Sequence, residues 1–166
     1  MMNLKIRFPV TVILCILSLT LLSPIITFAD KTEDKILSVT EGFFIALKER
    51  KFADAWELLT IKSKDTIITE VYKGINKTNA KIGRDVVREE FDKKGDLFLI
   101  YWNAFIKNFD TNTVLEQSVW NIGEIKSNRA ILILRYKKSE YDSELQIYKE
   151  DGKWRFGLVE SYWTRK

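Results

Sequence analysis

Aromatic side chains are the residues of this chain that have the most to offer a ligand. The sequence contains five tryptophans, six tyrosines and ten phenylalanines. Small-molecule sites are usually apolar pockets with a few convergent polar groups. The sequence predicts such a pocket from aromatic residues of the second half of the chain, with one polar residue to orient the ligand: Trp102, Trp120, Tyr136 and Trp154, with Arg135 or Gln146. In the alternative interpretation these rings only fill the core.

Several chemistries are excluded by composition. The chain has no histidine, so it cannot form a Ser-His-Asp or Cys-His catalytic site or a histidine-ligated zinc site. Its one cysteine is Cys15. Two acidic groups, within 30–34 and 89–92, lack the alternating spacing of a calcium loop. We therefore expect no metal and no cofactor.

The first 29 residues have the pattern of a secretory signal peptide. Lys5 and Arg7 precede an apolar run over 10–22, and Ala29 supplies a small residue before Asp30. A basic start, an apolar middle and a small-residue exit are typical of such leaders. We expect export, to a periplasm or outside the cell, of a single domain over 30–166. The alternative is an uncleaved anchor, because 10–29 carries no charge and is long enough to span a bilayer.

The charge balance does not favour nucleic acid as a partner. Lys and Arg total 27 against 23 Asp and Glu, which gives a net charge of +4. The basic residues are scattered among acids and form no long block. Without Cys15 the exported part has no cysteine, so its stability depends on a hydrophobic core and not on disulfides.

Apolar spacing predicts helices in the first part of the exported chain. Stripes with helical periodicity occur over 36–47, 52–59 and 98–109. The stretch 60–97 is more polar and is interrupted by glycines. It predicts two weaker helical faces, or alternatively a lid or mobile insertion.

The pattern changes to strands after Asp110. Strands are predicted over 114–124, 130–137 and 141–149, and a fourth follows the Asp151-Gly152 turn. The run 130–134 is apolar at every position, which predicts a central strand covered on both faces. Helices followed by an antiparallel meander define an α+β fold, with N-terminal helices packed on a curved four-stranded C-terminal sheet.

Two stretches resemble the nuclear transport factor 2-like superfamily. Residues 43–60 (FFIALKERKFADAWELLT) resemble its opening helix, short break and second helix, and 147–156 (IYKEDGKWRF) resemble its closing hairpin. The resemblance implies a cone in which a curved sheet wraps on helices around a pocket. It also implies that the open sheet face can mediate a homodimer. It does not imply one activity, because the fold hosts many.

These observations favour an exported, non-catalytic binding or interaction domain. It would hold a small apolar ligand in the cone or a protein partner on the sheet face. One alternative is a membrane-anchored assembly subunit of an envelope complex, which requires that 10–29 be retained. The other is an isomerase- or dehydratase-type enzyme, because the isomerase branch of the superfamily pairs a carboxylate base with a phenol. The candidates for that chemistry are Glu116, Glu124, Glu144 and Glu160, with Tyr101 and Tyr136.

Overall fold

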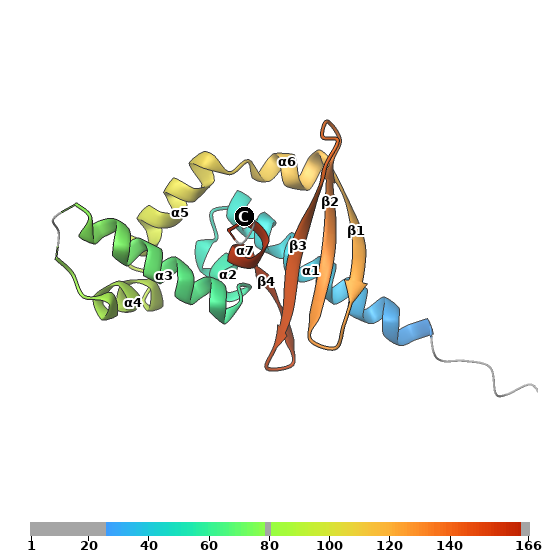
Figure 1. Ribbon diagram of the computed structural model, residues 1–166, viewed down its shortest axis with the longest axis horizontal. Coiled ribbons are helices and arrows are strands. Elements are labelled where there is room, and N and C mark those ends of the chain that lie inside the picture. Colours follow the sequence, from blue (N-terminus) through green and yellow to red (C-terminus); the bar gives the residue numbers. More distant parts are fainter. Residues whose placement is uncertain (1–25, 79–80, 164–166) are drawn as a thin grey trace, which may run out of the picture. The chain divides into compact units, whose positions relative to one another are not determined.

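The apolar stripes of the first half of the chain form helices. The computed structural model describes residues 26–78 and 81–163, with side chains from Lys31 onward (Figure 1). Among these described residues, six helices precede the sheet: α1 (Ile26–Lys48), α2 (Phe52–Glu57), α3 (Ile61–Asn76), α4 (Arg84–Asp92), α5 (Asp96–Asn108) and α6 (Thr111–Glu116). The strands are β1 (Ser118–Ile125), β2 (Arg129–Tyr136), β3 (Asp142–Glu150) and β4 (Lys153–Gly157), and α7 (Leu158–Tyr162) follows them.

The chain divides into two units, residues 1–32 and 33–166, and the second contains the sheet and the described helices apart from the opening turns of α1. Of the first unit, only the opening turns of α1 are described, so most of the predicted leader 1–29 lies outside the described residues. Within 26–78 and 81–163, no helix has the length and apolarity needed to cross a membrane.

The sheet is an open antiparallel meander in the order β1-β2-β3-β4, and the chain has the predicted α+β class. Figure 1 shows the sheet as curved, with the helices gathered toward one of its faces. Ala130, Leu132 and Leu134 of β2 point to this inner face and are buried. On the other side Ile131 and Ile133 are only half-buried. The prediction that β2 is covered on both faces was therefore wrong, although the strand is central.

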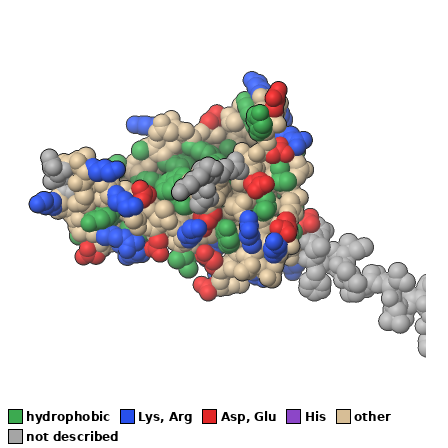
Figure 2. Space-filling model, in the orientation of Figure 1, with side chains coloured by type: hydrophobic (Ala, Val, Ile, Leu, Met, Phe, Trp, Pro, Cys, Tyr) green, Lys and Arg blue, Asp and Glu red, His purple; other side chains and the backbone are tan. Residues whose placement is uncertain are grey.

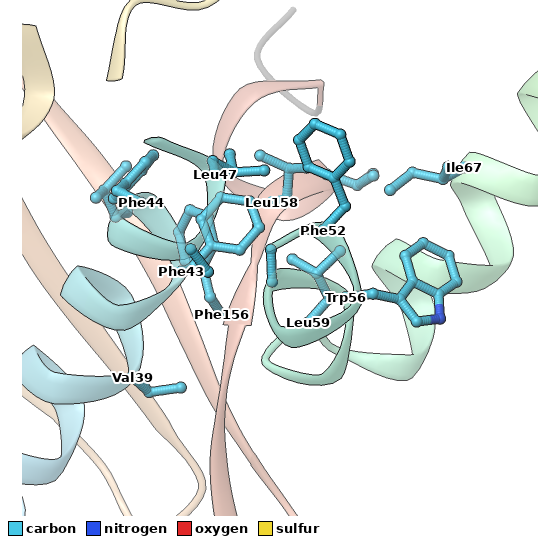
Figure 3. Packing of buried hydrophobic residues seen from close by; sticks show 14 of the residues in the cluster. Val39, Phe43, Phe44, Leu47, Phe52, Trp56, Leu59, Ile67, Phe156 and Leu158 are labelled. Carbon is cyan, nitrogen blue, oxygen red and sulfur yellow. The ribbon is translucent and has the colours of Figure 1, made fainter. Parts of the chain in front are cut away.

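Aromatic rings fill the space between α1, α5 and the sheet. The ring of Phe44 lies 5.7 Å from Phe109, 5.8 Å from Trp120 and 5.5 Å from Phe156. Figure 3 shows Phe43, Phe44 and Leu47 of α1 grouped with Phe156 and Leu158. This packing places the C-terminal hairpin directly on the first helix.

One local interpretation of the sequence needs correction. The predicted strand over 114–124 begins as a helix, because Asp110 accepts hydrogen bonds from the backbone N–H groups of Asn112 and Thr113 and so caps α6. The two weaker helical faces predicted within 60–97 are confirmed, because they belong to α3 and α4, which pack on each other. In α4, Val87 and Phe91 are buried against the core.

Candidate functional site

Trp102, the first predicted ligand residue, belongs to the core. Its indole is fully buried and lies 6.2 Å from the ring of Phe43 and 5.4 Å from that of Phe105. Its Nε1 has no hydrogen-bond partner among the described residues. The neighbouring Tyr101 hydroxyl is likewise shielded and without a partner there. Burial raises the pKa of Tyr101 well above its ordinary value.

The other three aromatic candidates occupy separate positions on the inner face of the sheet. Trp120 is half-buried, and its Nε1 donates to the backbone oxygen of Val114 at 3.0 Å. Tyr136 donates through its hydroxyl to Gln117 Oε1 at 3.4 Å. Trp154 lies on β4, where the Lys149 ammonium is 5.9 Å from its ring centroid. The four aromatic candidates therefore do not converge on one another.

One depression does include a predicted residue. It has a volume of about 270 Å³ and is lined by Leu37, Glu41, Leu115 and Trp120. Because Trp120 Nε1 is already bonded to the backbone, the indole offers mainly its apolar surface there.

The two polar candidates lie on the outer face of the sheet. The Arg135 guanidinium donates to both carboxylate oxygens of Asp142, at 2.6 Å each. This pairing holds the pKa of Asp142 below its usual range. Gln146 accepts from Arg129 at 2.9 and 3.1 Å. Both residues are engaged in cross-strand pairs on the face opposite to Trp120 and Leu132, so neither joins the aromatic candidates in a pocket.

The carboxylates considered for catalysis are also separated. Glu116 pairs with Lys48 at 2.5 Å, Glu124 pairs with Lys126 at 3.1 Å, and Glu144 is exposed on the outer face. Glu160 is buried and accepts hydrogen bonds from the hydroxyl groups of Thr60 at 3.0 Å and Ser63 at 2.7 Å. Glu160 thereby ties α7 to the start of α3, where Thr60 is the N-cap.

The outer face of the sheet presents apolar surface that the sequence analysis did not single out. We call the outer sheet face the side of the sheet that carries Val119, Gly123, Ile131, Ile133 and Tyr148. Val119 is 49% exposed. A Cβ on Gly123 would lie 3.1 Å from the backbone oxygen of Ile131, so a glycine suits this close approach of β1 to β2, where the pairing register shifts between Ile122 and Ile125. The alternation of side chains along β1 was the available sequence signal for two faces, but it did not show which face the helices cover.

Charges of both signs cover the helical part of the surface. Figure 2 shows acidic and basic side chains interspersed over the visible face. One cluster surrounds Trp56, where the ammonium groups of Lys64 and Lys94 each lie 5.7 Å from the ring centroid. Glu57 lies 3.4 Å from both ammonium groups. Burial alone would raise the pKa of Glu57, but the two lysines outweigh burial and lower it.

Comparison of the chain with protein-family models, with curated proteins and with solved structures finds no match. Among the described residues there is no group of histidine, cysteine or acidic side chains that could hold a metal ion.

Proposed function

We propose that this chain is an exported, non-catalytic interaction domain of the nuclear transport factor 2-like type, whose outer sheet face binds a second copy of the chain. The observation that carries the proposal is the set of apolar side chains that this face leaves open or half-open to solvent. Val119 is 49% exposed and lies opposite Arg135 in the β1–β2 pairing, and the half-buried Ile133 and Ile131 follow Arg135 along β2 on the same face. Apolar surface gathered on one face is typical of interaction sites.

The charges of the outer sheet face suit a two-fold contact. Arg129 and Arg135 lie on the same face as Asp142 and Glu144. In a two-fold interface, a surface that carries both signs can pair with itself. The resemblance to the nuclear transport factor 2-like superfamily supports a dimer through the sheet face. The resemblance in turn is supported by the α+β order of the elements and by the position of α1 and α2 before the meander.

The test is the oligomeric state of Val119→Glu, measured by analytical ultracentrifugation over a range of concentrations. Val119 is already exposed, so the substitution leaves the core intact. We expect the parent protein to dimerise and the variant to sediment as a monomer. The matched control is Ile61→Glu, because Ile61 is 59% exposed on a helix. A parent protein that remains monomeric, or equal dissociation in the control, would contradict the proposal.

A second candidate function is supported by the depression beside Trp120. Its lining is apolar apart from Glu41, so it suits a small apolar ligand with a hydrogen-bond donor or a cation. Native mass spectrometry of the protein purified from its own host would detect a co-purified ligand. Trp120→Leu should abolish that adduct, whereas Trp154→Leu should leave it in place.

Export is proposed on the pattern of residues 1–29 alone. The intact mass of the protein from its native host distinguishes the two interpretations of this segment. A mature chain that begins at Asp30 would support cleavage, and a full-length mass would support the membrane-anchored assembly subunit.

A further inference from the structure

The margin of the sheet at β1 carries backbone groups that point away from the rest of the sheet. The strand order places β1 at one end, with β2 as its strand neighbour (Figure 1). The N–H of Lys137 donates to the oxygen of Gln117 at 3.0 Å, and the same register pairs Val119 with Arg135. Hydrogen-bonded pairs alternate along an antiparallel ladder, so the N–H and C=O groups of the intervening residues face away from β2. These residues are Ser118, Trp120 and Ile122.

We call residues 118–122 the β1 edge. Among the described residues, no other element forms backbone hydrogen bonds with it. At the opposite margin of the sheet, by contrast, Phe156 of β4 forms a bridge with Leu59. Proteins protect exposed edges with charged residues, prolines and bulges. In β1 such devices follow the edge, as a shift of register after Ile122 and an ion pair of Glu124 with Lys126. Residues 118–122 contain no charge and no proline, so the β1 edge is open to a further strand.

The depression beside Trp120 lies at the β1 edge. Two of its lining residues, Leu37 and Glu41, come from α1, and Leu115 comes from α6. None comes from β2, although Leu134 of β2 is the cross-strand neighbour of Trp120. The depression therefore lies on the side of Trp120 that faces away from β2, which is also the side of the free backbone groups.

A strand added to β1 would hold a side chain over this depression. In an antiparallel pair, side chains directly opposite each other share a face, with their Cβ atoms about 5 Å apart. The residue opposite Trp120 would therefore project from the inner face, next to the indole and toward Leu37 and Leu115. In this mode of recognition, main-chain hydrogen bonds give the affinity and a pocket selects the side chain.

The charge of the depression selects a cation. Among the described residues that line it, Glu41 alone carries a charge, and its side chain is exposed. Its carboxylate forms no ion pair or hydrogen bond within the described part of the chain. A lysine or arginine would lay its aliphatic stem on Leu115 and Trp120 and bring its charged head to Glu41. A second copy of β1 would offer only Ser118, Trp120 or Ile122 there and would leave Glu41 without a cation.

From these observations we propose that the β1 edge is a docking site for an extended segment of a partner protein. The segment pairs antiparallel with residues 118–122 and places a lysine or arginine beside Trp120, against Glu41. The proposal rests on the depression that carries the second candidate function, and it narrows the occupant to a side chain of a bound segment. The segment lies beside β1 and not on the outer sheet face, so it does not compete with a second copy for one surface.

The experiment measures the binding of short fluorescein-labelled peptides by fluorescence anisotropy. One peptide alternates valine and threonine around a central lysine, and in the other glutamate replaces that lysine. We expect the lysine peptide to bind and the glutamate peptide not to bind. Glu41→Gln should weaken binding of the lysine peptide at least tenfold. The matched control is Glu140→Gln, which should bind as the parent does, because Glu140 is exposed in the turn after β2 and does not line the depression.

Methylation of the peptide backbone separates strand pairing from binding in the depression alone. In the antiparallel arrangement, the N–H groups of the lysine and of every second residue from it face β1, whereas those of the residues between them face solvent. N-methylation two residues to either side of the lysine should therefore abolish binding. N-methylation of the residues directly next to the lysine should preserve it.

Equal binding of the lysine and glutamate peptides, or parent-like binding by Glu41→Gln, would overturn the proposal. Binding that survives methylation of the residues facing β1 would overturn it as well, because the depression would then take a cation without strand pairing. A parent protein that binds neither peptide would also refute the docked segment. A co-purified small ligand in native mass spectrometry would still support the second candidate function in that case, so the two failures are distinguishable.

Discussion

Removing the hydroxyl of Tyr101 should stabilise the protein. The hydroxyl is shielded from solvent and has no hydrogen-bond partner among the described residues. Its ring packs against Phe91, Trp102 and Phe105, so Tyr101→Phe keeps the aromatic contacts. A buried polar group without a partner costs about 1–3 kcal/mol. We expect a gain in the free energy of unfolding within that range, which corresponds to a rise in Tm of about 4 °C per kcal/mol for a domain of this size.

The effect should grow with pH. Burial raises the pKa of Tyr101, so the native state keeps its proton while the unfolded state loses it near the ordinary value of about 10. Stability is thus fully present below that pH and is lost above it, by up to about 1.4 kcal/mol per pH unit. Tyr101→Phe lacks this loss, and the difference in stability from the parent should widen above about pH 10.

Urea unfolding followed by circular dichroism at neutral and alkaline pH measures both effects. Tyr136→Phe is the control, because the Tyr136 hydroxyl donates to Gln117 in an exposed pair and its loss should change little. A Tyr101→Phe variant less stable than the parent at neutral pH would refute the reasoning, since it would reveal a hydrogen bond that the hydroxyl makes in solution.

Three further predictions concern groups that hold the helices in place. Glu160→Ala should lower the free energy of unfolding by about 2–4 kcal/mol, because it leaves the hydroxyl groups of Thr60 and Ser63 without their acceptor. Glu124→Ala is the control, because Glu124 forms an exposed pair. Equal losses of stability in the two variants would contradict this prediction. Asp110→Ala should lower the Tm by removing the cap of α6. Since hydrogen bonds from Thr113 lower the pKa of Asp110, the difference in Tm should be full near neutral pH and should be lost gradually as the pH falls from the ordinary aspartate pKa through the lowered pKa of the native state. pH titrations of the melting curve measure this. Gly74→Ala should stabilise α3 by about 0.5–1 kcal/mol, since a Cβ there meets open space. Gly157→Ala should destabilise the protein, since its Cβ would lie 2.9 Å from the backbone oxygen of Gln146. Chemical denaturation of the two variants provides the comparison.

The fold class could be predicted because the apolar residues of the main helices and of the last hairpin repeat with a clear period. The apolar positions of 36–47 and 98–109 repeat with the helical period, and the Asp151-Gly152 turn separates two alternating segments. The turn has the expected left-handed backbone at both residues, with φ values of 49° and 76°. Residues 114–116 were misassigned because Val114 and Leu115 suit a strand as well as a helix, and the cap at Asp110 decides between them.

The candidate site could not be predicted to the same degree. Alternation along β2 separates two faces, but it does not say which one the helices cover, so Arg135 and Trp120 were grouped although they lie on opposite sides of the sheet. The contact between Arg50 and Asn103 gave no local signal either. Arg50 and Asn103 are 53 residues apart in sequence, and their contact depends on how the α1–α2 turn packs on α5.

The edge of β4 has a consequence for synthesis of the chain. Phe156 donates its N–H to the Leu58 oxygen at 2.8 Å, and its own oxygen accepts from Thr60 N–H at 3.0 Å. The connection between α2 and α3 thus gains its backbone partners from a residue made almost a hundred positions later. During translation these hydrogen bonds between the α2–α3 connection and β4 can form only after the final hairpin has left the ribosome. A truncation just before β4 should therefore leave a protease-sensitive helical intermediate and not a smaller folded domain.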